Sequence, residues 1–275
     1  MTGDLGVAVQ SRFLAIGATS SFASADVGAV ATQALTNVSY GPRALDLLAA
    51  GTTATRTLDV LLQSDVLQDR RQAAVVDVQG RVAVHTGSGC AGYAGHVTGP
   101  GFSCQGNMLV SHDVVHQMAT VMSDEGSALP ERMLAALLAG QEAGGDARGQ
   151  QSASLLVARQ DGGYGGLSDR LVDLRVDDHA TPILELQRLL GLHRLYFDKP
   201  DEDAMLPLGP LVDEIAQRLV RLSHVPASTS EDAVWDALDQ WSGRENLEER
   251  MTRRGHVDPT VLACLRRTDE VGEGH

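Results

Sequence analysis

The sequence predicts an α+β protein with antiparallel sheets, followed by a small all-helical domain. The strands and helices of the first part come in blocks rather than in strict alternation, which favours antiparallel sheets. No G-x-G-x-x-G motif follows a strand, so a dinucleotide-binding fold is not indicated. Near residue 180 the composition changes from Gly, Ala, Val, Ser and Thr to Leu, Arg, Asp and Glu at helical spacing. We therefore expect one domain over residues 1–180 and a second over residues 181–275.

The composition restricts the kinds of ligand and partner that this protein can bind. The 275 residues are 43% hydrophobic, which is enough for a packed core, and the formal net charge is −14. This negative charge argues against nucleic acid and anionic lipid as ligands. Three cysteines are too few for a disulfide framework or a zinc ribbon, no apolar run has the length of a membrane span, and no secretory signal is visible. We expect a cytoplasmic protein that acts on a small molecule and uses neither metal nor cofactor.

Short apolar and β-branched runs predict the strands. The turn residues Val78, Gln79 and Gly80 separate two such runs and predict a hairpin, and a glycine-rich loop at residues 162–166 separates a second pair. The expected strands cover residues 5–11, 27–34, 72–77, 81–85, 101–106, 152–158 and 169–176.

Helices are predicted where apolar residues recur at helical spacing. Gly41 and Pro42 begin one that ends before Gly51, a usual residue just past a helix. Thr181 and Pro182 supply an N-cap and a first-turn proline for another. The expected helices cover residues 41–48, 54–62, 113–122 and 131–142, then 182–196, 208–222, 231–241 and 258–268, with a shorter one near 244–251.

Six separated segments together resemble a known family. They are Gly-Val-Ala-Val-Gln-Ser-Arg at 6–12, Val-Gly-Ala-Val-Ala-Thr-Gln-Ala at 27–34, Tyr-Gly-Pro-Arg at 40–43, Gln-Gly-Asn at 105–107, Gly-Gly-Asp-Ala-Arg-Gly-Gln-Gln-Ser-Ala at 144–153, and Leu-Arg-Val-Asp-Asp-His at 174–179. In this order they resemble the bacterial family called domain of unknown function 1028, over roughly residues 3–178. The family looks like a member of the N-terminal nucleophile (Ntn) hydrolases, so the resemblance implies an αββα sandwich. Residues 183–268 resemble the helical domain often appended to this family and labelled peptidoglycan-binding.

The start of the chain departs from the family pattern. Ntn chemistry uses a Thr, Ser or Cys at the free N-terminus of the first strand, with the α-amine as the base. Residues 1–5 match the hairpin turn after that strand, so we expect the strand and its nucleophile position to be missing. Three explanations stay open: a longer native chain, a strand that has been lost together with its chemistry, or Thr2 as the nucleophile after removal of Met1.

Polar residues inside or beside strands are the first candidates for the site. Arg12 follows a strand and can hold a carboxylate through its planar fork, or form a surface ion pair. Thr32 and Gln33 are neighbours in an apolar strand, so they point to opposite faces and one of them can face a cleft. Gln105 and Asn107 flank a glycine and suit an oxyanion hole or amide recognition, or else form a polar turn.

Charged residues near loops are the second group. Asp146 and Arg148 lie in a glycine-rich loop, either as site residues or as a pair that only shapes the turn. Asp178 lies in an Asp-Asp-His run whose neighbouring side chains diverge, which favours a helix-entry loop over a metal site. His112 and His116 have the spacing of half a metal site, but no Glu joins them.

These residues lead to one hypothesis with two alternatives. The hypothesis is an Ntn-like hydrolase of a small linear or cyclic amide, with Thr2, Gln105, Asn107 and Asp146 as candidate catalytic residues. Arg12, Thr32, Gln33, Arg148 and Asp178 are the candidate substrate-binding residues. The alternatives are a non-catalytic scaffold that binds a ligand or assembles, and a lyase or cyclase that uses the same pocket. Because an unpaired sheet edge invites pairing, we also expect a homodimer.

Overall fold

The computed structural model describes residues 3–124 and 126–272 of the chain, with side chains described up to residue 268. Thr2 therefore lies outside the described residues. The chain divides into two compact units, one up to Leu190 and one from Gly191. This division falls inside a helix that begins at Pro182, ten residues beyond the expected boundary.

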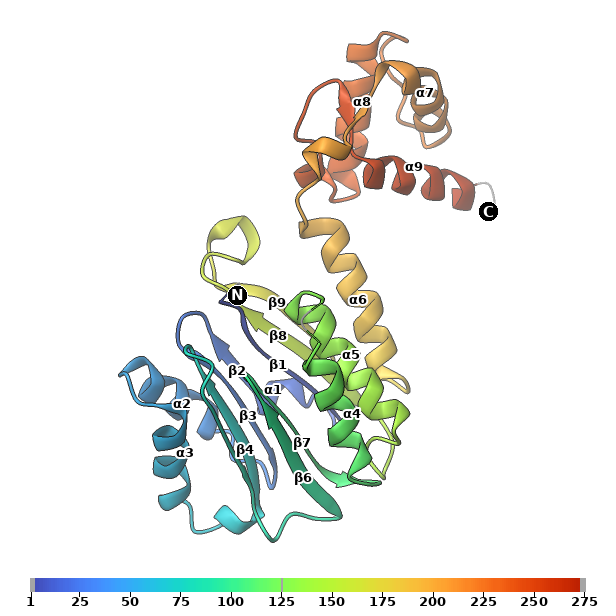
Figure 1. Ribbon diagram of the computed structural model, residues 1–275. Helices are drawn as coiled ribbons and strands as arrows, with labels where there is room; N and C mark the ends of the chain where they lie inside the picture. The colour runs from blue at the N-terminus through green and yellow to red at the C-terminus, as the bar shows by residue number, and fades with distance from the viewer. Residues whose placement is uncertain (1–2, 125, 273–275) are drawn as a thin grey trace. The chain divides into compact units, whose positions relative to one another are not determined.

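One sheet of the first unit has four antiparallel strands and is covered by two helices on its outer face (Figure 1). Val30 and Val75 point from neighbouring strands into an apolar cluster with Tyr40, Leu58 and Leu61 of the helices. The strands, in sheet order, are β2 (Ser21–Ser24), β3 (Gly28–Ala34), β4 (Arg71–Asp77) and β5 (Val82–Thr86), and the helices are α2 (Tyr40–Ala49) and α3 (Ala54–Gln63).

The second sheet has the order β1-β8-β9 and is antiparallel throughout. The alternating burial of β1 places Leu5 and Val7 against Ala29 and Ala31 of β3, so the two sheets pack face to face. The opposite face packs against a helix through Met133 and its neighbours. The elements are β1 (Leu5–Ser11), β8 (Ser152–Ala158), β9 (Arg170–Val176), α4 (Asp113–Met122) and α5 (Leu129–Glu142).

A separate antiparallel hairpin, β6 (Tyr93–Gly99) and β7 (Phe102–Leu109), completes the first unit. Leu109 of β7 packs against Val114 and Val115 of α4. The hairpin thus lies under the same helical pair as β1 and β8, while β7 also approaches β4 of the opposite sheet (Figure 1). The layers run helix, sheet, sheet, helix, which confirms the predicted α+β class.

The second unit is a helical bundle. Its buried cluster is centred on Trp241, with Leu219 and Leu265 from the flanking helices. Ser230 caps one helix by accepting a hydrogen bond from the Ala233 backbone N–H at 3.3 Å. The elements are α6 (Pro182–Phe197), which begins in the first unit, α7 (Val212–Arg221), α8 (Glu231–Arg244), α9 (Pro259–Gly272), and the short strands β10 (Leu206–Pro207) and β11 (His256–Val257).

A buried ion pair holds this bundle together. Arg250 Nη1 lies 2.8 Å from Asp258 Oδ2, and both side chains are less than one-tenth exposed. The same guanidinium donates to the backbone carbonyls of Arg194 and Leu195 at the end of α6. Within the described ranges, no helix combines the length and apolarity needed to cross a bilayer.

Candidate functional site

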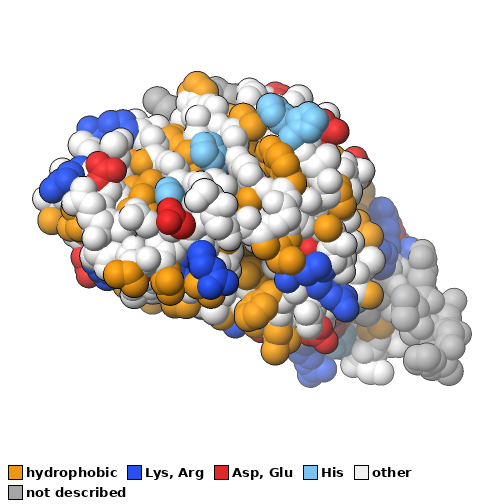
Figure 2. All heavy atoms as spheres, turned by 90° about the horizontal axis from the view of Figure 1, so that it is seen from below, with side chains coloured by type: hydrophobic (Ala, Val, Ile, Leu, Met, Phe, Trp, Pro, Cys, Tyr) orange, Lys and Arg blue, Asp and Glu red, His pale blue; other side chains and the backbone are white. Residues whose placement is uncertain are grey.

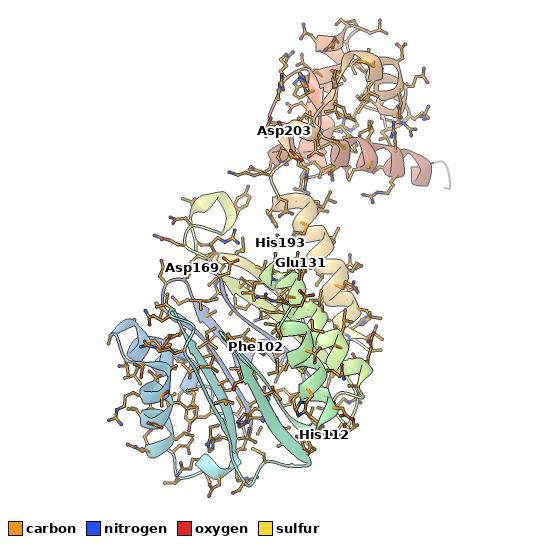
Figure 3. The ribbon with its side chains drawn as sticks, viewed as in Figure 1. Phe102, His112, Glu131, Asp169, His193 and Asp203 are labelled. Atoms are coloured by element: carbon orange, nitrogen blue, oxygen red, sulfur yellow. The ribbon has the colours of Figure 1, made fainter. Side chains whose placement is uncertain are left out.

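A cavity of about 200 Å³ lies between β1 and β7. Its sides are formed by residues 8–11 of β1 and residues 103–109 of β7. Ala31 and Gln33 of β3 line it from the opposite sheet, and residues of α4 and α5 line it from the helical layer. In Figure 3, Phe102 marks the start of β7, and His112 marks the point beyond its end where α4 begins.

Gln72 is the central polar residue beside this cavity. It is fully buried on β4 and lies in register with Gln33 on β3. Its Oε1 atom accepts hydrogen bonds from Gln33 Nε2 at 2.7 Å and from Asn107 Nδ2 at 3.2 Å. Its Nε2 atom donates to the Gly106 carbonyl and to Thr86 Oγ1, both at 2.9 Å. A buried amide that is satisfied on both ends fixes the orientation of the amides around it.

Sequence reasoning missed Gln72. It stands at the start of an apolar strand, where a single glutamine matches no motif, and only its pairing with Gln33 across the sheet reveals its role.

Gln105 and Asn107 lie within strand β7, so the turn considered for them from the sequence is wrong. Because they are two residues apart in a strand, their side chains point to the same face, toward the cavity. Gln105 Oε1 accepts from Ser103 Oγ at 2.7 Å. The backbone carbonyl of Gln105 lies 3.5 Å from Gln33 Nε2. Gln33, Gln105 and Asn107 therefore bring three amide side chains to one wall.

Asp146 and Arg148 form a two-point ion pair that also lines the cavity. Arg148 donates from Nη2 to Asp146 Oδ2 at 2.7 Å and from Nε to Oδ1 at 3.0 Å. Asp146 is buried, whereas the side chain of Arg148 is 40% exposed. Burial alone would raise the pKa of the Asp146 carboxyl, but hydrogen bonds from the Arg148 side chain and backbone outweigh it and hold the pKa below its usual value.

Asp146 is a single bridge residue beside β7, with a turn of the chain on either side. Asp146 forms an antiparallel bridge with Leu109, and Ala147 N–H donates to the Met108 carbonyl at 2.8 Å. On its other side, the Arg12 backbone N–H, just after β1, donates to Asp146 Oδ2 at 3.4 Å. Gly144 and Gly145, with φ of +113° and +62°, let the chain turn from α5 toward Asp146.

Three sequence-predicted residues lie away from the cavity. The side chain of Arg12 is exposed and donates to the Gln150 carbonyl at 2.9 Å. Thr32 is fully buried on the opposite face of β3 and donates to the Asn37 carbonyl. Asp178 is exposed and accepts from Gln151 Nε2 at 3.1 Å. The prediction that the Arg12 side chain shares a cleft with Asp146 and Arg148 is wrong, because that side chain lies outside the cavity lining. Of the two neighbours on β3, Gln33 faces the cavity and Thr32 does not, because alternate residues of a strand point to opposite faces.

The cavity offers few other side chains that could act as a nucleophile or a base. Burial raises the pKa of the Cys104 thiol to about 12, so it stays protonated at neutral pH. Among the described residues that line the cavity, none is a histidine or a lysine. Figure 2 shows histidine side chains on the face seen from below, and the rings of His112 and His116 lie 5.7 Å apart. The described part of the chain holds no group of three or more side chains that would suit a metal ion.

The backbone is strained at the cavity. Ala34 at the end of β3 and Met108 in β7 both line it and have φ of +65° and +54°. L-residues rarely adopt this left-handed conformation, which costs roughly 1–2 kcal/mol, and such residues gather at functional sites.

Fold and site together define an α+β sandwich protein with an amide-lined cavity at the edge of one sheet. The chain belongs to the family described as "Family of unknown function (DUF1028)", whose model matches residues 1–186. Residues 196–265 match the model described as "Putative peptidoglycan binding domain". Both matches confirm the family resemblance seen in the sequence.

A solved structure supports this assignment. The crystal structure of protein SPO2555 from Silicibacter pomeroyi, of the same family, is 28% identical, with a TM-score of 0.64. The similarity covers 70% of this chain and 84% of that one. The comparison with curated proteins found no match.

Proposed function

We propose that the cavity between β1 and β7 binds a small linear or cyclic amide. The observation that carries this proposal is the group of three amide side chains, Gln33, Gln105 and Asn107, on one wall. A primary amide both donates and accepts hydrogen bonds, so it complements the N–H and C=O of another amide. Two of the three are held in place by hydrogen bonds to Gln72, which lowers the entropic cost of binding.

Arg148 gives the ligand a second point of contact. Its Nε and Nη2 atoms bind Asp146, which leaves Nη1 to meet a carbonyl or carboxylate oxygen of a ligand. Because Asp146 fixes the guanidinium plane, little side-chain freedom is lost on binding.

A calorimetric titration with acetylglycinamide, as a linear amide, and with cyclic glycylglycine, as a cyclic one, tests the proposal. We expect the Asn107→Leu variant, which keeps the shape but loses the amide, to bind at least tenfold more weakly. The matched control is Gln160→Leu, at an exposed position after β8. Equal affinity of the Asn107→Leu protein and the unchanged protein would refute amide recognition by this wall.

Hydrolysis of the bound amide is the finer form of the proposal. The helix-sheet-sheet-helix layering supports it, because the resemblance links this layering to Ntn hydrolases. The step would add water across the C–N bond to give a carboxylic acid and an amine, with Thr2 as the predicted nucleophile. Among the described lining residues Asp146 is the one carboxylate, and the hydrogen bonds that lower its pKa make it a weak base, so we assign the base to the Thr2 α-amine.

Mass spectrometry of the products separates the possible reactions. Hydrolysis adds the mass of water, whereas a lyase or cyclase step does not, and an unchanged ligand indicates a binding protein. A Thr2→Ala variant should abolish turnover but leave calorimetric binding intact if Thr2 acts as proposed.

The match over residues 196–265 favours a second candidate function, peptidoglycan binding by the helical unit. Co-sedimentation with purified cell-wall sacculi tests it. The competing proposal is a cytoplasmic homodimer in which this unit mediates packing. Cell fractionation and light scattering decide between the two, because a wall-bound monomer would exclude the dimer.

A further inference from the structure

A second cavity of the first unit lies between β2 and the β8-β9 pair. Its volume is about 280 Å³, just below the roughly 300–1,000 Å³ typical of sites for drug-sized ligands, so it has room for a small organic molecule. It is lined by residues 17–18 of α1 (Gly17–Ser20), residues 21–23 of β2, one residue of α2, and side chains of β8 and β9. The two cavities share no described lining residue, so a ligand here contacts a different set of side chains.

Charged side chains from β9 form one wall of this second cavity. Asp173 and Arg175 are two residues apart, so they share one face of the strand. The register with β8 skips Leu171, and this bulge brings Arg170 to the same face. The outer strand of the opposite sheet, β2, packs on β1 and β8, and the three charged side chains stay partly exposed. The cavity is therefore open to solvent along its charged wall.

Two hydrogen bonds tie β9 to the chain on either side of β2. The Ala25 N–H, in the turn after β2, donates at 3.0 Å to Oδ2 of Asp169, which is labelled in Figure 3 just before β9. The Ala15 N–H, before α1, donates at 2.9 Å to the carbonyl of Asp177, just after β9. Both bonds flank the lining residues along the chain, so the walls are held in place before a ligand arrives.

Arg175 offers unused hydrogen-bond donors to this cavity. Arg170 forms an ion pair with Asp173, but the guanidinium of Arg175 makes no hydrogen bond to the described residues. Its ion-pair partner Asp177 lies 3.6 Å away, from Nη2 to Oδ2, which is beyond hydrogen-bond distance. A Cβ atom at Gly17 would lie 3.1 Å from Cδ of Arg175, so this glycine lets the arginine stem lie against α1. The planar fork is thus positioned for the oxygens of an anion.

A pair of serines supplies a further donor inside the cavity. Ser154 of β8 is the register partner of Arg175 and is 2% exposed. Its Oγ atom lies 3.3 Å from Oγ of Ser21 on β2, and this hydrogen bond uses one of the two hydroxyl protons. The other proton has no acceptor among the described residues, so it suits an oxygen atom of a ligand.

The rest of the wall is mainly apolar. Phe22, Leu45 and Leu156 line the cavity together with the charged and hydroxyl groups. Two arginines and one aspartate give this lining one net positive charge, although the whole chain carries −14. The combination fits a ligand with one negative charge and a short hydrocarbon group, because a bare inorganic anion leaves the apolar wall without a partner.

We propose that this second cavity binds a small monocarboxylate with a short hydrocarbon chain. The carboxylate accepts hydrogen bonds from the Arg175 guanidinium and from the serine pair. The hydrocarbon lies against Phe22, Leu45 and Leu156. Because no lining residue is shared with the first cavity, this site does not depend on amide binding there.

Calorimetric titration of the full chain with 4-methylpentanoate tests the ligand class. Three comparison compounds each lack one feature: 4-methyl-1-pentanol lacks the charge, acetate lacks the hydrocarbon chain, and inorganic phosphate is an anion without carbon. We expect 4-methylpentanoate to bind roughly tenfold more tightly than any of them. Equal affinity for the alcohol overturns carboxylate recognition. Equal or tighter binding of acetate or phosphate overturns the role of the apolar wall.

Substitutions of exposed arginines test the residue that carries the proposal. Arg175→Gln removes the charge and the fork, so 4-methylpentanoate should bind roughly tenfold more weakly. The matched control is Arg56→Gln, at an exposed position of α3, which should bind as the unchanged protein does. Arg175→Lys keeps the charge without the fork and should have an intermediate affinity. Unchanged affinity of Arg175→Gln overturns the proposal.

Hydrogen exchange locates the bound carboxylate. 4-Methylpentanoate should slow amide exchange in residues 17–24 and leave residues 103–109 unchanged. Protection of residues 103–109 instead places the carboxylate near Arg148 in the first cavity and overturns the proposal. If 4-methylpentanoate binds as expected and acetylglycinamide does not bind, the carboxylate site stands and the proposed amide function fails. If only acetylglycinamide binds, this inference fails alone.

Discussion

Gln33 Nε2 donates a 2.7 Å hydrogen bond to Oε1 of Gln72, its register partner on the neighbouring strand. The pair lies on the face of its sheet that looks toward the other sheet, where most side chains are small and apolar. Since Gln72 also binds Asn107 from a different hairpin, this one amide joins β3, β4 and β7. The fold and the cavity wall therefore depend on the same residue.

Replacing Gln72 by Leu should strongly destabilise the first unit. The change leaves the Gly106 carbonyl, Thr86 and two amides without their partner in a buried place. Each unsatisfied buried group costs roughly 1–3 kcal/mol, so we expect a loss of about 2–4 kcal/mol after partial relaxation. Urea unfolding measures it, with the exposed Gln160→Leu as the control. A loss below about 1 kcal/mol would show that the network is dispensable.

Replacing Asp146 and replacing Arg148 should have different effects on stability and on ligand binding. Asp146→Ala removes a buried carboxylate but leaves a guanidinium that is 40% exposed and still hydrated. We therefore expect a loss of about 1–3 kcal/mol, less than for a fully buried pair. Arg148→Lys keeps the charge but loses the planar fork, so amide binding should weaken while the unfolding midpoint moves little. Unchanged binding in Arg148→Lys would leave the pair a purely structural role.

Asp65 should make the free energy of unfolding depend on pH. A hydrogen bond from Arg71, which outweighs burial, together with bonds from Asn37, the Leu67 N–H and Tyr40, holds the pKa of Asp65 far below its usual value. A lowered folded-state pKa contributes stability that is present above the unfolded pKa of about 4 and is lost as the pH falls toward the folded value.

Urea unfolding at pH 7 and pH 3 checks this expectation. The unchanged protein should be clearly less stable at pH 3. An Asp65→Asn variant should be less stable than the unchanged protein at pH 7 and should show a weaker pH dependence. The same slope in both proteins would exclude Asp65 as the cause.

A substitution in the helical unit tests whether the two units unfold independently of each other. Asp258→Ala leaves Arg250 buried without its carboxylate, although two backbone carbonyls still accept from it. Breaking a buried pair from one side typically costs about 3–5 kcal/mol, and we expect the lower end here. Calorimetry should show a lower melting temperature for the helical unit and an unchanged transition for the first unit. A shift of both transitions would mean that the two units unfold as one.

The larger elements of the fold were predictable because their apolar patterns are local. Strands β1, β3, β4, β8 and β9 coincide closely with the runs expected from the sequence. The missed strands have little pattern of this kind: β2 is only Ser-Phe-Ala-Ser, and β6 is rich in glycine. Hairpin pairing with the next strands, β3 and β7, makes them strands, and neither segment carries the alternating apolar pattern that predicts a strand.

Part of the candidate site was predictable from polar residues that stand beside glycines. Asp146, Arg148, Gln105 and Asn107 do line one cavity. The alternation that separates Thr32 from Gln33 shows that one of them faces the cavity, but which one depends on how the sheets pack. The predicted location of the Arg12 side chain was wrong for another reason. The backbone N–H of Arg12, and not its guanidinium, reaches Asp146.

Asp146 contacts the ends of two strands that line the cavity: its backbone bridges to Leu109 at the end of β7, and its carboxylate accepts from the Arg12 N–H just after β1. The width of the cavity at this end therefore depends on one carboxylate. Loss of that carboxylate should loosen both strand ends together, and amide exchange in residues 8–11 and 103–109 should then become faster.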